Sequence, residues 1–328
     1  MRTIPCFFYR DGEHFTLPPE FSAAPPNPCA FVVAGEGGSV MPDPRWFTPV
    51  SDPAKAEVFL FPWDIGQYID AGASAVIWRV IAALPYLSGR ENRHIVCDDG
   101  DFTQPPPLPV ALFKISVTKA IAAACVSMPY ALPAHMAHEA PSFDWSQIRY
   151  DTSFVGNITN AARPAAVASI KKQAPELRFF ADVDNSFVVR DGYFFNTRVS
   201  GDPAKTARRQ ELFRASLKES LTVLCPPGVG PHSIRLYETM SMGRVPVLFG
   251  DDAVYPLAKL VGYEDFCLVI PHDEIMNTGN ILKAWLAAKG EETLHEMGVA
   301  ACRAWNRYLV PEKVHGFLLA EARTRFWG

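Results

Sequence analysis

The sequence lacks the features of several large protein classes. No apolar run reaches membrane-spanning length, no internal repeat of fixed period is visible, and the seven cysteines form no C-x-x-C pair. These absences argue against a membrane-spanning chain, a repeat protein and a zinc ribbon. Because the cysteines are odd in number and widely spread, reduced thiols in a cytosol fit better than a disulfide framework. The net charge of −4 gives no reason to expect nucleic acid as a partner.

Length and pattern indicate two α/β domains. A chain of 328 residues with 48% hydrophobic residues is long enough to bury two sizeable cores. In the first half we expect strands at residues 4–9, 30–33, 58–61 and 94–97 and a helix at 71–87. In the second half we expect strands at 152–155, 177–181, 221–225 and 245–249, helices at 162–172 and 203–216, and a helical last third. The pattern breaks near residues 136–150, so we place the boundary between 145 and 146.

The most informative segment is residues 221–250. It begins with a short apolar strand and continues with a Gly- and Pro-rich loop at 226–231. A helix is expected around 233–242, ending at Gly243, and a buried strand follows. A helix that follows a strand and a glycine loop points unpaired N–H groups into the crevice, which favours a phosphate. The segment therefore predicts half of a nucleotide-binding unit.

Four side chains of this segment are candidate nucleotide ligands. Arg235 and Glu238 lie three residues apart on one helix face, where a cation for diphosphate would sit beside a carboxylate for ribose hydroxyls. Each has a simpler reading, Arg235 as a surface ion-pair partner and Glu238 as a carboxylate that complements the helix dipole. Ser233 is a candidate phosphate contact or only the N-cap, and His232 is a candidate phosphate donor or a structural histidine.

Carboxylates follow two strands expected in the first half. Asp64 follows the strand at 58–61, and Asp98, Asp99 and Asp101 lie in the loop after 94–97. Open α/β sheets place their chemistry at the carboxyl ends of strands, so these side chains are candidates for a general base. The Asp-Asp-Gly-Asp run also fits an ordinary turn or a Mg²⁺ site.

Several segments, in order, resemble the exostosin-like glycosyltransferases. They are Asp-Pro-Ala-Lys-Ala-Glu-Val-Phe-Leu-Phe-Pro at 52–62, His-Ile-Val-Cys-Asp-Asp-Gly-Asp at 94–101, Ser-Phe-Val-Gly-Asn at 153–157 with Arg163 downstream, the strand at 220–226, and Ser-x-Arg-x-x-Glu at 233–238. The resemblance covers roughly residues 50–275, and the order of the segments is more specific than any one of them. It adds Gly156 and Arg163 as candidate donor-binding residues. The alternative interpretation of Arg163 is a solvated arginine at the start of a helix.

The resemblance implies a GT-B-type fold, in which two Rossmann-like domains face a cleft. The acceptor is then expected in domain 1–145 and the donor in domain 146–328, and in such transferases the last helix often crosses back to the first domain. The donor-binding candidates are Gly156, Arg163, His232, Ser233, Arg235 and Glu238. The base would be Asp64, ahead of Asp99 and then Asp101. We expect no metal or other cofactor, because Arg235, Arg163 and the helix N-terminus can neutralise the leaving diphosphate.

The function that the resemblance implies is transfer of a sugar from a nucleotide sugar, a UDP-sugar, with inversion at the anomeric carbon. The expected acceptor is a glycan or a lipid-linked glycan. The animal members are anchored in the secretory pathway, so the absence of an anchor here favours a bacterial or viral cytosolic relative. We therefore expect surface polysaccharide synthesis in a cytoplasm, with peripheral association at the inner membrane face. The alternatives are a GDP-sugar-dependent, fucosyltransferase-like enzyme and a non-catalytic nucleotide-sugar or glycan-binding module.

Overall fold

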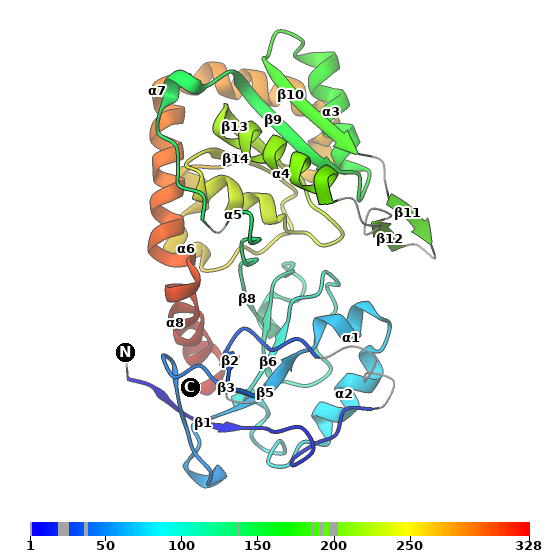
Figure 1. Ribbon diagram of the computed structural model, residues 1–328, viewed down its shortest axis with the longest axis vertical. Helices are drawn as coiled ribbons and strands as arrows, with labels where there is room; N and C mark the ends of the chain where they lie inside the picture. Colours follow the sequence, from blue (N-terminus) through cyan, green and yellow to red (C-terminus); the bar gives the residue numbers. More distant parts are fainter. Residues whose placement is uncertain are drawn as a thin grey trace. The chain divides into compact units, whose positions relative to one another are not determined.

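The chain folds into two α/β units, each built around its own parallel sheet (Figure 1). The computed structural model describes residues 2–18, 26–35, 39–136, 138–184, 187–190, 193–196 and 203–328. Unit 1 comprises Met1–Met128, Val254–Leu257 and Pro311–Gly328, and unit 2 comprises Pro129–Ala253 and Ala258–Val310. The predicted α/β class with two Rossmann-like sheets, as in the GT-B type, is confirmed.

The sheet of unit 1 has six parallel strands. In spatial order they are β4 (Phe47–Pro49), β1 (Ile4–Phe8), β5 (Val58–Asp64), β6 (His94–Asp98), β7 (Ala111–Lys114) and β8 (Cys125–Ser127). The strand order reverses between β1 and β5, because β4 lies on one side of β1 and all later strands lie on the other. A separate antiparallel pair joins β2 (Val32–Ala34) and β3 (Val40–Pro42).

Two short helices, α1 (Gly66–Asp70) and α2 (Ser74–Ala82), cover one face of this sheet. Their apolar side chains pack on aromatic residues of β1 and β5, such as Phe7 and Phe59. The sequence predicted one helix over residues 71–87. The structure has the shorter α2 within that range, whereas α1 precedes it and was not predicted; the chain turns between the two helices at Gly72, which has a left-handed φ of 80°.

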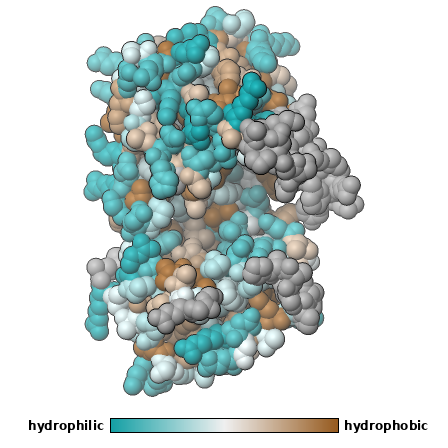
Figure 2. All heavy atoms as spheres, viewed as in Figure 1, coloured by the Kyte–Doolittle hydropathy of each residue, from teal (hydrophilic) through white to brown (hydrophobic). Residues whose placement is uncertain are grey.

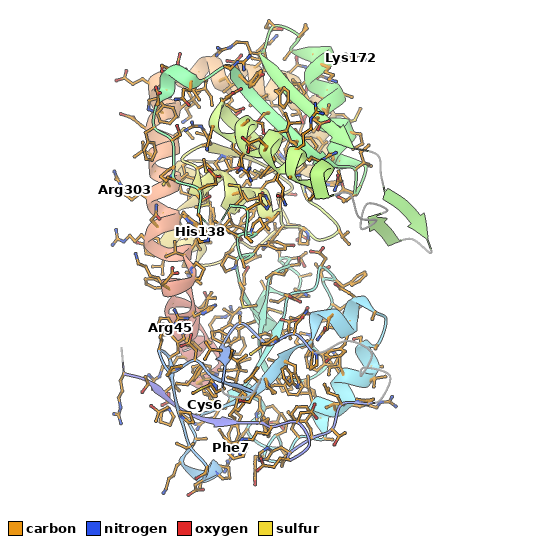
Figure 3. All side chains as sticks on the ribbon, in the orientation of Figure 1. Cys6, Phe7, Arg45, His138, Lys172 and Arg303 are labelled. Atoms are coloured by element: carbon orange, nitrogen blue, oxygen red, sulfur yellow. The ribbon has the colours of Figure 1, made fainter. Side chains whose placement is uncertain are left out.

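The last helix of the chain, α8 (Pro311–Ala322), belongs to unit 1. A Cβ on Gly316 would lie 2.7 Å from the Trp46 ring, so α8 packs closely on the segment before β4. In the same segment Arg45, labelled in Figure 3, pairs with the buried Asp43 at 2.6 Å. The terminal π-helical turn Arg323–Trp327 contacts the turn Glu91–Arg93.

The sheet of unit 2 has five parallel strands. In spatial order they are β10 (Phe179–Asp184), β9 (Tyr150–Asn157), β13 (Ser220–Cys225), β14 (Val245–Phe249) and β15 (Leu268–Ile270). Here the order reverses between β9 and β13. The strands predicted at 152–155, 177–181, 221–225 and 245–249 are confirmed within a few residues. A separate antiparallel pair joins β11 (Phe187–Arg190) and β12 (Tyr193–Asn196).

Helices cover both faces of the unit 2 sheet. They are α3 (Ala162–Gln173), α4 (Pro203–Lys218), α5 (Ile234–Ser241), α6 (Ala258–Val261) and α7 (Thr278–Ala304), which is interrupted at Gly290. Phe154 and Val155 alternate along β9 and therefore face opposite sides. Phe154 packs with α3 and α7, whereas Val155 packs with Phe213 and Leu217 of α4.

Unit 2 begins at Pro129, upstream of the division at 145/146 that the sequence pattern gave. The intervening segment packs on unit 2. Met136 joins the core around Val155, Arg244 donates to the carbonyl of Ser142 at 2.5 Å, and the Trp145 ring stacks on His295. Such long-range contacts cannot be read from the breaks in a sequence pattern.

Hydrophilic side chains dominate the visible surface of both units, with apolar ones scattered among them (Figure 2). In the described part of the chain, no helix combines the length and apolarity needed to cross a membrane. The seven cysteines are all free and all buried.

Candidate functional site

The expected donor-binding residues gather at the reversal of strand order in unit 2. In open parallel sheets the carboxyl ends of the strands beside such a reversal form a crevice where ligands bind. Here the two strands are β9, which ends at Asn157, and β13, which ends at Cys225. The loop after β9 leads to α3, and the loop after β13 leads to α5. The residues predicted from the sequence lie at this strand end or in these two loops and helices.

Arg235 crosses from α5 to the end of β9. Its Nε and Nη2 donate to the carbonyl oxygen of Val155 at 3.1 and 2.8 Å, and its guanidinium lies 4.9 Å from the centre of the Phe154 ring. Gly156 provides the space for this contact, because a Cβ there would lie 2.0 Å from Nη2. The Phe-x-Gly motif and the Ser-x-Arg helix, far apart in sequence, therefore form one structural unit.

Glu238 lies one turn after Arg235, on the buried side of α5. The residue is 4% exposed, and burial raises the pKa of its carboxyl to about 7 against the opposing effect of Arg235. No described residue donates a hydrogen bond to this carboxylate. A buried acceptor without a protein donor is costly unless a ligand or water supplies one. Glu238 is thus suited to accept from the hydroxyls of a bound molecule.

The start of α5 carries the other two candidates from the loop. Ser233 occupies the N-cap position in an extended conformation, yet its side chain makes no capping hydrogen bond. Its buried hydroxyl has no hydrogen-bond partner among the described residues. His232 is also buried beside it. The N-terminus of α5, with a free hydroxyl at its cap, has the properties of an anion-binding position.

Arg163 connects the two loops of the site. It is 7% exposed, and its Nε donates to the carbonyl of Pro227 at 2.9 Å while Nη1 donates to that of Asn157 at 2.7 Å. Asn160 makes a parallel contact by donating to the carbonyls of Pro227 and Gly228. Arg163 is therefore not a solvated arginine. These contacts give it a role in holding the glycine loop, and direct contact with a ligand stays a prediction.

Two residues of this region escaped the sequence analysis. Asn160 has a recognisable local signal, because its side chain accepts from the Ala162 N–H at the start of α3. Arg209 of α4 reaches the same strand end, with Nη2 3.4 Å from the Gly156 carbonyl and from the Asn157 side chain. Nothing in its sequence neighbourhood distinguishes Arg209 from other helix arginines.

In unit 1 the predicted carboxylates lie at the ends of β5 and β6. Asp64 is 4% exposed and accepts from the Gly66 N–H at 2.7 Å and from the Asp99 N–H at 3.1 Å. Burial, the side-chain hydrogen bond with Asp99 and its nearby charge raise the pKa of Asp64 to about 9. Asp99 itself is exposed, and Asp101 accepts from the Ser116 hydroxyl at 3.2 Å.

A buried ion pair fixes the loop that carries Asp99. Lys114 of β7 is fully buried and donates to Asp98 at 2.7 Å and to the Gly100 carbonyl at 2.9 Å. Within the described ranges, no group of three or more His, Cys, Asp or Glu side chains is arranged to hold a metal ion. His94 lies at the start of β6, away from the loop that follows this strand. Its two ring nitrogens contact the Tyr9 hydroxyl and the Arg90 carbonyl, and burial lowers its pKa to about 4.

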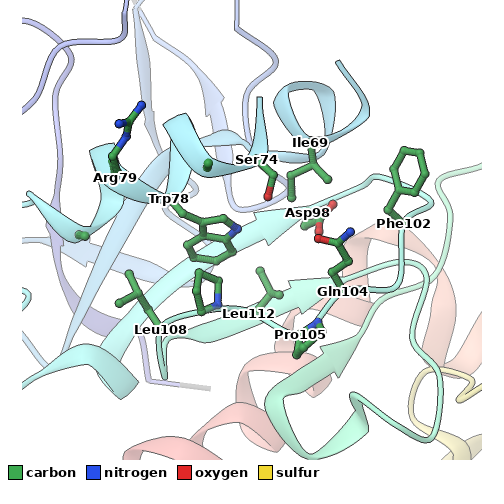
Figure 4. A pocket seen from close by; sticks show the side chains of 13 residues that line it. Ile69, Ser74, Trp78, Arg79, Asp98, Phe102, Gln104, Pro105, Leu108 and Leu112 are labelled. Carbon is green, nitrogen blue, oxygen red and sulfur yellow. The ribbon is translucent and has the colours of Figure 1, made fainter. Parts of the chain in front are cut away.

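A cavity of about 600 Å³ opens beside this loop, within unit 1. Figure 4 shows the Trp78 ring of α2 among its lining side chains, together with Leu112 of β7 and Leu108 of the preceding loop. Asp98 at the end of β6 and Gln104 of the loop after it complete the polar part of the lining. An aromatic ring with a few polar groups is a common lining for a small-molecule site.

A family model described as the exostosin GT47 domain matches residues 115–285, just over half of the chain. The chain belongs to the exostosin GT47 family. The resemblance stated from the sequence is thereby confirmed. The match contains Gly156, Arg163, Arg235 and Glu238, whereas Asp64 and the loop after β6 lie outside it.

Similar proteins of this family come from plants. The probable glucuronoxylan glucuronosyltransferase IRX7 of Arabidopsis thaliana is 29% identical over 102 residues, which is 28% of this chain and 23% of that protein. A probable glucuronosyltransferase of Oryza sativa subsp. japonica is 32% identical over 66 residues, which is 20% of this chain and 16% of that protein. The exostosin chain thus matches less than a quarter of the length of either. Sucrose-phosphate synthase from Thermosynechococcus elongatus, a solved structure, is 10% identical with a TM-score of 0.44, covering 98% of each chain.

Proposed function

We propose that this exostosin-family chain is a glycosyltransferase that moves a sugar from a nucleotide-sugar donor to a glycan acceptor. The observation that carries the proposal is the Arg235 and Glu238 pair at the strand reversal of unit 2. Glu238 is a buried carboxylate that receives no hydrogen bond from the described residues, and Arg235 lies one turn away. A ligand with hydroxyls beside a diphosphate matches both groups.

In the proposed donor complex, Glu238 accepts from the ribose hydroxyls. The diphosphate lies toward Arg235, the Ser233 hydroxyl and the N-terminus of α5, with Arg209 at the same strand end. Arg163 and Asn160 hold the 226–231 loop in place through its carbonyls. These contacts place positive charge where the leaving diphosphate develops its negative charge, so they stabilise the transition state.

The reaction proposed is an inverting displacement. A carboxylate of unit 1, from the candidates Asp64, Asp99 and Asp101, takes the proton of the acceptor hydroxyl. The acceptor oxygen then bonds to the anomeric carbon as the bond from that carbon to the diphosphate oxygen breaks. The electron pair leaves with the nucleoside diphosphate, whose charge Arg235 and the α5 N-terminus offset without a required metal ion.

The nucleotide, the acceptor and the cellular setting of the reaction are also proposals. We propose UDP as the nucleotide, because the plant relatives carry names of glucuronosyl- and xylosyltransferases. The same names favour a polysaccharide acceptor. A bacterial surface glycan, a lipid-linked acceptor and a place at the inner membrane face are the settings that we propose from the sequence alone.

Release of nucleoside diphosphate from a panel of UDP- and GDP-sugars tests the proposal. We expect the wild type to release UDP, with faster release when a glycan acceptor is present. Glu238→Gln and Arg235→Ala should both be impaired, whereas Arg303→Ala, an exposed change on α7, should not. Release from GDP-sugars alone would favour the fucosyltransferase-like alternative. Tight nucleotide binding without release from any donor would contradict catalysis and indicate a binding module.

A further inference from the structure

The carboxyl groups of Asp64 and Asp99 form a pair at the end of β5. The strands bring them together because the five residues of β5 from Leu60 to Asp64 lie opposite only the three residues of β6 from Ile95 to Cys97. This irregularity directs Asp64 toward the loop after β6. The Ile65 N–H then bonds to the Cys97 carbonyl at 2.9 Å, which fixes the end of β5 against that loop.

The contact between the two residues is tightly built. The Asp99 N–H donates to both oxygens of Asp64, at 3.2 and 3.1 Å, and the two side chains also share a hydrogen bond. Gly66 allows the approach, because a Cβ there would lie 2.5 Å from Oδ1 of Asp99 and 2.3 Å from the Gly100 nitrogen. Lys114, through Asp98 and the Gly100 carbonyl, holds the loop from its other side.

The two members of the pair differ in access to solvent. Asp64 is buried, whereas Asp99 is exposed. Two carboxyl groups that share a hydrogen bond hold one proton between them, and the proton resides on the group that is harder to ionise. Burial makes that group Asp64. Asp99 is then the member of the pair that a substrate can reach.

We propose that Asp99 is the proton acceptor of the transfer reaction, and that Asp64, in its acid form, is the positioning residue that holds Asp99 by a hydrogen bond. This inference rests on the proposed function. The loop that carries Asp99 also lines the 600 Å³ cavity through Phe102 and Gln104, next to Asp98 at the end of β6. An acceptor sugar stacked on Trp78 in that cavity would lie against the same loop.

In the proposed step, the acceptor O–H bond breaks and its proton passes to the Asp99 carboxylate. The oxygen forms the new bond to the anomeric carbon, and the nucleoside diphosphate leaves with the electron pair. Asp64 keeps its own proton throughout. Other charged or titratable groups act on the pair. Tyr68 of α1 and Cys97 of β6 act on Asp64, whereas Asp70 of α1 and Asp98 of β6 act on Asp99. Asp11, Asp101 and Lys114 interact in turn with Tyr68, Asp70 and Asp98.

The test is the pH dependence of turnover in the full chain, with UDP affinity measured on each variant. Asp99→Asn should lose turnover about a hundredfold or more at unchanged UDP affinity. Asp64→Asn should retain most of the turnover, because an amide can donate the same hydrogen bond. Wild type should lose activity at alkaline pH as Asp64 loses its proton, and Asp64→Asn should lack this alkaline fall. Asp252→Asn, an exposed carboxylate outside the pair, should keep both turnover and the alkaline fall.

Full turnover in Asp99→Asn, or an alkaline fall in Asp64→Asn equal to that of wild type, would overturn the assignment while leaving the proposed function intact. If wild type itself transfers no sugar from any donor, both proposals fall together. Carboxyl carbon NMR gives a readout that needs no activity. The Asp64 carboxyl should titrate well above the usual range of an aspartate, and an ordinary aspartate titration of Asp64 would overturn the inference.

Discussion

Gly156 and Arg235 fit together at the end of β9, where a Cβ on residue 156 would lie 2.0 Å from Nη2 of the arginine. The contact explains why a glycine and an arginine separated by nearly eighty residues belong to one site. The guanidinium can lie over the strand end only while residue 156 has no side chain.

We therefore expect Gly156→Ala to act through Arg235. The methyl group would displace the guanidinium from the Val155 carbonyl, lowering the free energy of unfolding by about 1–3 kcal/mol and weakening UDP binding. Because both changes remove the same contact, the double variant with Arg235→Ala should lose little more UDP affinity than Arg235→Ala alone. Calorimetric titration of the three variants measures this, and fully additive losses would show that the residues act independently.

The binding of uridine and the binding of UDP should distinguish the roles of Glu238 and Arg235. Glu238→Gln should weaken uridine and UDP alike, by about tenfold, because a charge-assisted hydrogen bond contributes about 1.5–3 kcal/mol. Arg235→Ala should weaken UDP and spare uridine. Burial raises the pKa of Glu238 to about 7, so its carboxylate gains a proton as the pH falls from 8 to 6. Uridine affinity of the wild type should fall over that range, and that of Glu238→Gln should stay level. Equal uridine losses in both variants would refute the two roles.

Removal of the Arg163 side chain should loosen the glycine loop. Arg163→Ala removes these donors from the half-buried carbonyls of Asn157 and Pro227, which should lower the free energy of unfolding by about 1–3 kcal/mol. Arg163→Lys should recover only part of this, since one ammonium cannot match both contacts of the planar guanidinium. Denaturant unfolding compares them with Arg303→Ala, an exposed helix change that should stay within about 0.5 kcal/mol of wild type. A similarly small effect of Arg163→Ala would contradict the loop-holding role.

Because Asp64 is protonated in the folded chain, its contribution to the free energy of unfolding should fall as the pH rises. Its pKa is about 9 in the folded chain and near 3.8 when unperturbed, so between these values the folded state binds the extra proton. Stability from this group is fully present below the lower value and declines as the pH rises through the interval. Asp64→Asn has no such proton, so its stability relative to wild type should increase from pH 5 to pH 8. Unfolding curves at both pH values measure the change, with exposed Asp252→Asn as control. A constant difference would mean that Asp64 is ionised in the folded chain.

Local patterns predicted the strands at the centre of both sheets but not β4, β7 and β8 of unit 1 or β15 of unit 2. The strand, loop, helix and strand at 221–249 were predicted nearly residue by residue, because apolar runs, Gly and Pro mark their limits. The break at Gly72 and the unit boundary at Pro129 were not, since each depends on packing partners far away in sequence.

The sequence predicted which residues belong to the site better than it predicted the contacts that they make. Arg235 and Glu238 follow from helix periodicity after a glycine loop. Arg209 could not be predicted, because only the fold of α4 beside β9 brings it to the Gly156 carbonyl. The burial of Asp64 and the exposure of Asp99 likewise depend on the strand irregularity in β5, which the sequence does not mark.

Thermal unfolding with a panel of nucleoside diphosphates tests the central claim most directly. A ligand that binds only the folded state adds roughly 2.7 kcal/mol at a hundredfold excess over its Kd, enough to raise the Tm by several degrees. We predict that UDP raises the Tm of the wild type, that Glu238→Gln and Arg235→Ala reduce the shift, and that Arg303→Ala leaves it unchanged. If no nucleoside diphosphate shifts the Tm of the wild type, the donor site in unit 2, and with it the glycosyltransferase account, is contradicted.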